Sequence, residues 1–206
     1  MKKNEINFAM VGCVFVTALV TSNILASKVI HLGPLEVPAA IVAYPFTFLM
    51  TDVIGEIWGK AHAQKIVYVG IMCQIISLAM IGAAIYLPPA DYMAGYNEEY
   101  RNVLGSTART VFASLVGFMC SQTCDVILFH KLRELFTDRK WLRNNASTMC
   151  SQVVDSVVFV TIAFWGMGMN LPVMIVSQII VKWIIALIDT PIFYALTRGN
   201  SPEKTV

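Results

Sequence analysis

The sequence predicts an all-α membrane protein with six transmembrane helices and with both termini in the cytoplasm. Of its 206 residues, 57% are hydrophobic and only 14% are charged, whereas about a quarter of the residues in a typical soluble domain carry a charge. The mean hydropathy is +0.66. Long apolar stretches alternate with polar loops, so we expect residues 1–206 to form one transmembrane domain without a separate catalytic or ATP-binding domain.

Six apolar stretches are long enough to cross a hydrocarbon core of about 30 Å at about 1.5 Å per helical residue. Pro88, Pro89 and Pro172 lie at the ends of these stretches, as expected of residues that interrupt helices. The predicted spans cover residues 7–28, 37–59, 65–87, 108–131, 147–168 and 172–197.

The loops between these spans alternate in charge. Lysines and arginines gather at the N-terminus, in the loop around residues 131–143 and in the C-terminal tail, whereas the loop 88–107 holds Asp91, Glu98 and Glu99. Because basic loops stay on the cytoplasmic side of a membrane, this pattern predicts cytoplasmic termini.

The outer loop 88–107 places Tyr92, Tyr96 and Tyr100 at every fourth position, which is one face if the segment is helical. Two interpretations are open. The segment is either an interfacial helix with its tyrosines at the level of the lipid headgroups, or a lid over an outward-facing site.

Ionisable side chains inside the predicted spans carry the functional argument. Each costs at least about 2.5 kcal/mol at the centre of a helix, so each requires a partner or a purpose. Asp52 and Glu56 lie four residues apart on one face of the second span. The pattern S-Q-x-x-D occurs twice, ending at Asp125 in the fourth span and at Asp155 in the fifth.

These two motifs lie in consecutive antiparallel spans. Counted from the cytoplasmic loop, Gln122 and Asp155 lie at one depth and Asp125 and Gln152 at another, roughly 8–14 Å inside the membrane. We therefore expect glutamine opposite aspartate at both depths. This box is either a closed set of hydrogen bonds between helices or a binding site whose groups bond to each other only when it is empty.

The balance of charges favours a binding site. Four aspartates lie well inside the spans and Lys182 is the only deep cation, so the other carboxylates must be protonated, face water, or meet a cation or a ligand. Glu56, one turn before Lys60, and Asp189 are candidates for ion coupling or gating. The candidate substrate-binding residues are Asn23, Asp52, Gln122, Asp125, Gln152, Asp155, Gln178 and Lys182.

Small residues and prolines within the spans add two weaker expectations. Pro45 in the second span and Pro191 in the sixth could expose backbone carbonyls to a site, because broken helices recur at binding sites within membranes. Gly55 and Gly59 would let another helix approach the second span closely.

Motifs for nucleotide binding and hydrolysis are absent from the sequence, which contains no GxxxxGK[ST], HExxH or GxSxG. The three histidines are scattered, and the five cysteines lack disulfide or zinc spacing. We therefore expect that the protein is not an enzyme and that it holds neither a metal site nor a cofactor.

Several motifs, each weak alone, together cover nearly the whole chain. The first half contains Asn23-x-x-Ala26-Ser27-Lys28, Tyr44-Pro45-Phe46, Thr51-Asp52-Val53 and Gly55-Glu56-x-Trp58-Gly59. The second half contains Ser121-Gln122-x-x-Asp125, Trp141-Leu142-Arg143-Asn144-Asn145 and Ser151-Gln152-x-x-Asp155. In this combination the chain resembles the queuosine precursor transporter family, also described as the vitamin-uptake-type transporter family.

The resemblance implies a multi-pass importer in the bacterial cytoplasmic (inner) membrane. Its substrates would be 7-cyano-7-deazaguanine and 7-aminomethyl-7-deazaguanine, precursors of the modified tRNA base queuosine, moved by secondary transport with proton or sodium coupling left open. A carboxylate could accept both donors of a guanine-like edge, and an aminomethyl cation would suit an acid-rich cavity. Phe46, Phe129 and Trp183 are candidates for stacking on the ring.

The alternative is a substrate-capture subunit of an ATP-driven uptake system for a vitamin-like small molecule, because six-helix proteins of similar size work in that way. A membrane-embedded enzyme would need a reactive triad or a metal cluster, and a purely structural subunit would not need so many intramembrane acids. The expected partners are a deazapurine and the lipid bilayer, with no nucleic acid. A second copy of the chain is a further candidate for so small a bundle.

Overall fold

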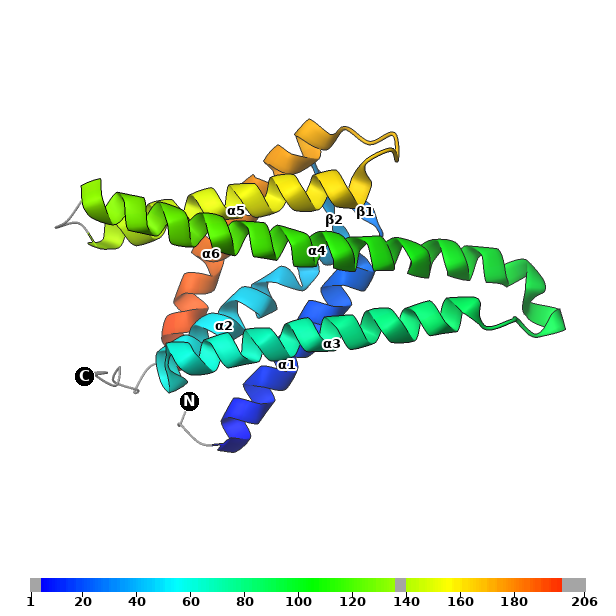
Figure 1. Ribbon diagram of the computed structural model, residues 1–206, viewed down its shortest axis with the longest axis horizontal. Coiled ribbons are helices and arrows are strands. Elements are labelled where there is room, and N and C mark those ends of the chain that lie inside the picture. The colour runs from blue at the N-terminus through cyan, green and yellow to red at the C-terminus, as the bar shows by residue number, and fades with distance from the viewer. Residues whose placement is uncertain (1–4, 136–139, 198–206) are drawn as a thin grey trace.

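The structure is a computed structural model that describes residues 5–135 and 140–197, apart from the side chains of residues 60, 125–126, 129–130, 132–135, 140–148, 186 and 190. The described chain is mostly helical, with one small β-hairpin (Figure 1). Its elements are α1 (Glu5–Leu25), β1 (Val29–Leu32), β2 (Leu35–Pro38), the 3-10 helix η1 (Ala39–Val42), α2 (Tyr44–Trp58), α3 (Lys60–Tyr86), the 3-10 helix η2 (Asp91–Met93), α4 (Ala94–Leu135), α5 (Lys140–Phe164) and α6 (Leu171–Thr197).

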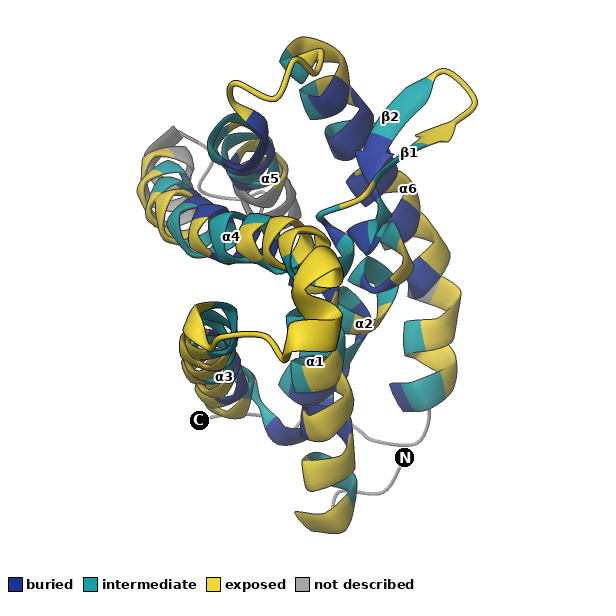
Figure 2. Cartoon of the chain, turned by 90° about the vertical axis from the view of Figure 1, so that its right-hand side faces the viewer, coloured by how far each residue is buried: buried dark blue, intermediate teal, exposed yellow. Residues whose placement is uncertain are grey.

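The outer faces of the helices are apolar, as lipid requires. Large apolar side chains on α3 are exposed, among them Tyr68, Met72 and Met80, and exposed residues line α3 and the start of α4 in Figure 2. The segments Glu5–Leu25, Ala61–Tyr86, Asp91–Cys124 and Leu171–Thr197 are long and apolar enough to cross a membrane, and Met149–Phe164 is a shorter apolar helix. The chain is therefore a helical membrane protein.

A β-hairpin follows α1, where the sequence predicted three more residues of helix and then a loop. α1 ends at Leu25, and strands β1 and β2 pair antiparallel from Val29 opposite Pro38 to Leu32 opposite Leu35. The turn between the strands contains Gly33, whose φ of +61° lies in the left-handed region that favours glycine. The backbone N–H of Glu36 donates to Ser177 Oγ (3.1 Å), so β2 is attached to α6.

Helix α2 is shorter than the predicted span 37–59. Pro38 ends β2, residues 39–42 form the turn η1, and α2 begins only at Tyr44, with Pro45 in its first turn. Pro45 was expected to open the backbone inside a span, but in the first turn it favours the start of a helix instead. At 15 residues α2 is about 22 Å long, less than the thickness of the hydrocarbon core.

The end of α2 depends on Gly59. Its φ of +93° stops the helix before α3 begins at Lys60. A Cβ on Gly55 would lie 3.8 Å from Ala63 Cβ, which is ordinary contact rather than the close helix approach expected of this pair. The side chain of Lys60, one turn after Glu56, lies outside the described residues.

Helix α4 includes most of the residues that were predicted to form the outer loop 88–107. It runs without a break from Ala94 to Leu135, so the segment with the three tyrosines belongs to η2 and to the first turns of α4. Tyr92 and Tyr96 are exposed. The start of α4 and the end of α3 extend together beyond the rest of the protein (Figure 1). The segment is thus neither a separate interfacial helix nor a separate lid.

Helices α4 and α5 pack side by side along most of their length (Figure 1). The guanidinium of Arg109 on α4 donates to the carbonyl oxygens of Ile162 (2.7 Å) and Trp165 (2.6 Å) at the C-terminal end of α5. This contact satisfies carbonyls that have no partner within a helix end. α5 then gives way to a turn with positive φ at Gly166 and Gly168, four residues before the predicted end of this span.

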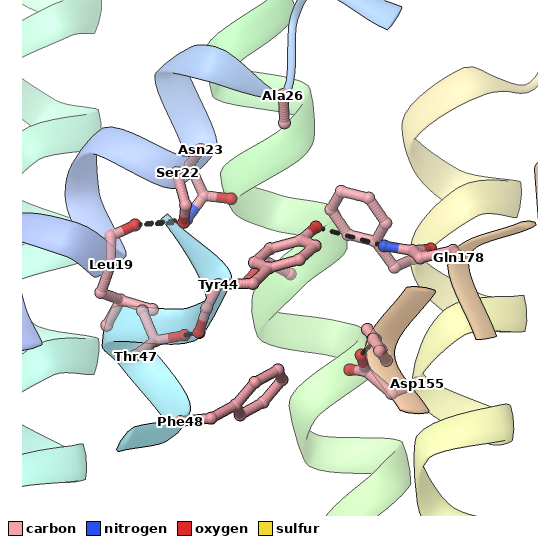
Figure 3. Close-up of a pocket in the computed structure, with 12 residues that line it drawn as sticks. Leu19, Ser22, Asn23, Ala26, Tyr44, Thr47, Phe48, Asp155 and Gln178 are labelled. Atoms are coloured by element: carbon pink, nitrogen blue, oxygen red, sulfur yellow. Dashed lines mark hydrogen bonds and ion pairs between the residues drawn. The ribbon is translucent and has the colours of Figure 1, made fainter. Parts of the chain in front are cut away.

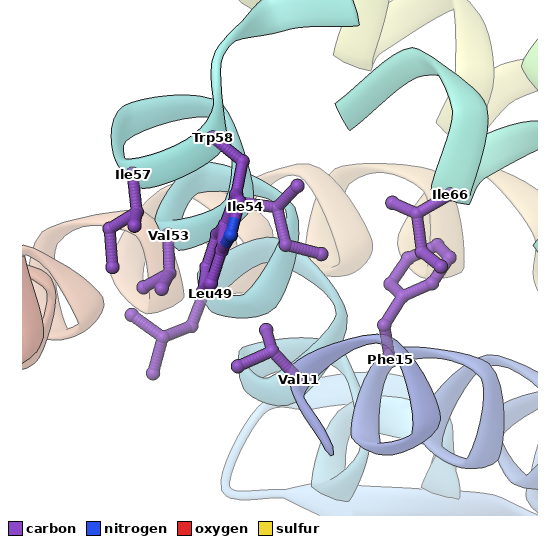
Figure 4. Close-up of a cluster of buried hydrophobic side chains, with 8 residues drawn as sticks. All are labelled: Val11, Phe15, Leu49, Val53, Ile54, Ile57, Trp58 and Ile66. Carbon is purple, nitrogen blue, oxygen red and sulfur yellow. The ribbon is translucent and has the colours of Figure 1, made fainter. Parts of the chain in front are cut away.

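Two apolar clusters flank the middle of the bundle. One joins α1, α2 and α3 and consists of Val11, Phe15, Leu49, Val53, Ile54, Ile57, Trp58 and Ile66 (Figure 4). The other joins the base of the hairpin to α4, α5 and α6 and consists of Ala26, Ala40, Ala113, Phe159, Val160, Ala163, Phe164 and Met174. The polar residues described next lie between elements that these clusters fix.

Candidate functional site

A pocket of about 130 Å³ lies between α1, α2, α4, α5 and α6 (Figure 3). A buried water needs only about 10–15 Å³, so the pocket has room for a small organic molecule. Its lining combines charged, amide, hydroxyl and aromatic side chains: Leu19, Ser22, Asn23, Ala26, Tyr44, Thr47, Phe48, Ser114, Asp155, Phe159, Gln178 and Lys182.

An ion pair between α5 and α6 forms the charged part of the pocket wall. Lys182 Nζ donates to Asp155 Oδ2 (2.5 Å) and to Ser156 Oγ (3.1 Å). Lys182 is 4% exposed, whereas the side chain of Asp155 is 29% exposed. Both side chains line the pocket, and that of Asp155 is the more exposed of the two.

The close approach of α4 to α5 depends on a glycine beside this carboxylate. A Cβ on Gly117 of α4 would lie 3.0 Å from Asp155 Oδ1 and 3.4 Å from the Asp155 carbonyl oxygen. Both distances are tight, so a larger side chain at this position would have to displace Asp155 or separate the two helices.

Gln178 forms a second polar position one turn before Lys182 on α6. Its Nε2 donates to the hydroxyl oxygen of Tyr44 on α2 (3.2 Å; Figure 3). Its Oε1 is buried and has no hydrogen-bond partner among the described residues. A buried acceptor without a partner is costly, so this oxygen is a candidate contact for a donor on a ligand.

Polar side chains fix the end of α1 that reaches the pocket. The carbonyl oxygen of Leu19 accepts hydrogen bonds from Ser22 Oγ (2.7 Å), Asn23 Nδ2 (3.3 Å) and Gln74 Nε2 of α3 (2.8 Å). The carbonyl oxygen of Asn23 accepts from Thr110 Oγ1 of α4 (2.9 Å). These bonds attach α1 to two neighbouring helices, so that Ser22 and Asn23 line the pocket from a rigid element.

The structure brings together half of the eight predicted substrate-binding residues. Asn23, Asp155, Gln178 and Lys182 all line the pocket. The polar and aromatic residues that sequence reasoning missed include Tyr44 and Phe48. Their spacing of four residues places both on one face of α2, but Asp52, four residues further on, lies outside the pocket lining, so this spacing alone did not single them out.

The predicted glutamine–aspartate box between α4 and α5 is wrong in the half that the structure describes. Gln122 is exposed on α4, and Asp155 contacts Gly117 on α4 and pairs with Lys182 on α6 instead. Depth counted from a loop located the two residues along their helices, but it could not fix the rotation of each helix about its axis. Gln152 is half-buried outside the pocket lining. The Asp125 side chain lies outside the described residues.

The rings that line the pocket are not the predicted ones. Phe46 and Trp183 are 51% and 38% exposed and lie outside the pocket lining, and the side chain of Phe129 is not described. Tyr44, Phe48 and Phe159 line the pocket instead. Phe46 and Phe48 are two positions apart on a helix, which places them on different faces.

The remaining predicted acids lie away from the pocket. Asp189 of α6 is buried, and its Oδ2 has no hydrogen-bond partner among the described residues. Its carboxylate interacts electrostatically with that of Asp52, which is exposed on α2. Glu56 is half-buried one turn beyond Asp52. In the part of the chain that the structure describes, no three His, Cys, Asp or Glu side chains gather in an arrangement that could hold a metal.

Apolar helices around a polar, partly charged pocket define a membrane protein with a candidate site for a small polar molecule. The family described as "Putative vitamin uptake transporter" matches residues 38–196, which is more than half of the chain. The chain belongs to this family, that of the queuosine precursor transporters, so the prediction from the sequence motifs is confirmed.

Three named relatives are similar over much of the chain. A "Probable queuosine precursor transporter" of Bacillus subtilis (strain 168) is 31% identical over 187 residues, which are 88% of this chain and 80% of the relative. The "Queuosine precursor transporter" of Escherichia coli (strain K12) is 26% identical over 71% of this chain and 64% of its own length. A further "Probable queuosine precursor transporter", from Haemophilus influenzae, is 27% identical over 60% of this chain and half of its own length. No solved structure shows a significant match.

Proposed function

We propose that this protein imports the queuosine precursors 7-cyano-7-deazaguanine and 7-aminomethyl-7-deazaguanine across the bacterial inner membrane, as a secondary transporter and not as an enzyme. The observation that carries the proposal is the pocket, in which Asn23, Asp155, Gln178 and Lys182 meet between apolar helices. Family membership and the names of the relatives support the same substrate class.

The groups around the pocket suit the edge of a 7-deazaguanine. The ring N–H and the exocyclic amine are adjacent donors, and the carboxylate of Asp155, whose side chain is 29% exposed, can accept from both. The carbonyl oxygen beside them can accept from an amide or an ammonium group, which Gln178 and Lys182 supply. Phe48 and Tyr44 offer faces on which the flat ring can stack.

We further propose that the chain crosses the membrane six times, with α2 and the apolar part of α5, Met149–Phe164, as the two short spans. The basic loop between α4 and α5 and the basic tail would face the cytoplasm, as would the N-terminus. A fluorescent protein fused to the C-terminus should then fluoresce, because that reporter folds only in the cytoplasm. A periplasmic phosphatase that is active at the same position would contradict this topology.

Uptake into liposomes tests the proposal. Purified protein, reconstituted without ATP or any other protein, should accumulate radiolabelled 7-cyano-7-deazaguanine faster than empty liposomes do. Asp155→Asn should abolish this uptake, because it replaces one of the two accepting carboxylate oxygens by a donor and leaves the buried Lys182 without its charged partner. Asp125→Asn is expected to do the same from the neighbouring helix.

The outcome also separates the two modes of transport. Uptake without ATP excludes a substrate-capture subunit that depends on an ATP-driven module. Binding without uptake would favour that alternative, and normal uptake by both aspartate variants would contradict the assignment of the site. Western blotting of the liposomes checks that each variant is present in equal amount.

A further inference from the structure

The charges of the described residues that line the pocket balance. Its described lining contains one carboxylate, Asp155, and one ammonium group, Lys182, joined by a hydrogen bond of 2.5 Å. Asp52, which the sequence predicted to bind the substrate, and Asp189, which it predicted to serve ion coupling or gating, lie outside the lining. The described lining of the pocket therefore presents a neutral pair and not an excess of negative charge.

We infer that Lys182 sets the charge preference of the pocket, so that it binds a neutral heterocycle in preference to a cationic one. This inference rests on the proposed function and deepens it. Lys182 is a cation that the protein itself supplies to Asp155, and a cationic ligand has to compete with it for the same carboxylate.

Burial makes that competition unequal. Lys182 is only 4% exposed, and Asp155 Oδ2 and Ser156 Oγ both accept hydrogen bonds from its ammonium group. A cationic ligand that bound to Asp155 would either share one carboxylate with a second cation or leave Lys182 buried without its partner. Both are unfavourable where water is largely excluded, because charges interact strongly and are poorly solvated there.

A neutral ligand avoids this conflict. A carboxylate has roughly four positions at which it can accept hydrogen bonds, and Lys182 occupies one of them at Oδ2. The exposed part of Asp155 can accept from the N–H groups of a ring while the ion pair stays intact. The unpaired Oε1 of Gln178 offers a further neutral acceptor in the same pocket.

The two expected substrates form a matched pair of probes, since 7-cyano-7-deazaguanine is neutral and 7-aminomethyl-7-deazaguanine is a cation at pH 7. Calorimetry on the purified, detergent-solubilised protein measures both dissociation constants. The wild type should bind the neutral probe at least about tenfold more tightly. Lys182→Met, which keeps a long side chain but removes the charge, should shift the ratio of the two constants at least about tenfold toward the cationic probe.

Two control variants keep the charge of the pocket unchanged. Lys182→Arg should retain the wild-type preference, because it restores a cation beside Asp155. Lys131→Met makes the same substitution at an exposed lysine on α4 and should leave both constants unchanged.

Each outcome decides the inference. Wild-type protein that binds the cationic probe as tightly as the neutral one overturns it, even if Lys182→Met does not fold. A Lys182→Met protein in which both constants change by the same factor overturns it as well, and would leave Lys182 with a purely structural role. Folded wild-type protein that binds neither probe would refute the proposed function itself, and this inference with it.

Discussion

The side chain of Gln178 is a candidate contact for the proposed substrate. The Gln178 side-chain amide donates one hydrogen bond to the hydroxyl oxygen of Tyr44. The side-chain carbonyl oxygen of Gln178 is buried at the pocket without a partner among the described residues. Such an acceptor costs about 1–3 kcal/mol when it is left unpaired. A bound ligand that donates a hydrogen bond to it would recover part of this cost.

We expect Gln178→Met to weaken binding of 7-cyano-7-deazaguanine at least about tenfold, equivalent to about 1.4 kcal/mol. The substitution keeps the length of the side chain but removes its acceptor and its donor. Gln122→Met is the matched control, because Gln122 is exposed on α4, and it should change the affinity by less than twofold. Equal losses in both variants, measured by calorimetry, would contradict the placement of the site.

The aromatic contacts allow a similar comparison. Phe48 lines the pocket, while Phe46 is 51% exposed on another face of α2. Phe48→Ala should reduce the affinity for a deazaguanine about five- to tenfold through the loss of ring stacking, whereas Phe46→Ala should leave it within twofold of the wild type. If Phe46→Ala lowers the affinity more than Phe48→Ala does in a binding assay, the sequence-based prediction that Phe46 stacks on the ring is the better one.

The part of the site that could be predicted from the sequence was found through the free-energy cost of placing polar side chains in lipid. That cost pointed to Asn23, Asp155, Gln178 and Lys182, which line the pocket. It could not separate these from Gln122, because the orientation of a polar side chain depends on the rotation of its helix. Aromatic residues carry no such cost in a membrane, so Phe48 did not stand out among the other rings of the sequence.

At the scale of secondary-structure elements, the close packing of α4 against α5 depends on Gly117. Its would-be Cβ lies 3.0 Å from Asp155 Oδ1 and 3.6 Å from Phe159 Cβ, and Asp155 and Phe159 both line the pocket. The spacing of these two helices therefore determines the position of the Asp155 carboxylate.

Gly117→Ala should lower the rate of uptake at least about fivefold, because the added methyl group has to displace Asp155 or move α4 away from α5. Gly105→Ala on the same helix is the control, since a Cβ there would meet nothing within 4 Å. That variant should transport normally and unfold at an equal or higher temperature, because alanine favours a helix over glycine by up to about 1 kcal/mol. Equal uptake by the two variants would show that the α4–α5 contact does not position the site.

Long apolar elements were predicted well and the polar connections between them were not. The bounds of α6 agree with the predicted span to within one residue, because nothing but helix satisfies the backbone of so long an apolar segment in lipid. The hairpin around Gly33 was missed, although Gly33-Pro34 is a turn signal between short runs of residues that favour strands. Continuous hydrophobicity across residues 37–43 likewise concealed the late start of α2 at Tyr44.

At the scale of the whole molecule, the two apolar clusters hold a short helix and a hairpin beside the pocket. α2 packs against α1 and α3 through one cluster, and the base of the hairpin packs against α4, α5 and α6 through the other. The pocket between them takes residues from five helices. A ligand in this position would contact both groups of helices at once, which is the arrangement that alternating access requires.

The most direct test of this account is the binding of 7-cyano-7-deazaguanine to the purified, detergent-solubilised protein, with guanine and adenine as competitors. We predict saturable binding that guanine weakens and that adenine does not displace. We expect Asp155 to accept from the N–H groups of a guanine-like edge, and adenine lacks the ring N–H at that edge. No binding by folded protein, or displacement by adenine as effective as that by guanine, would contradict the account.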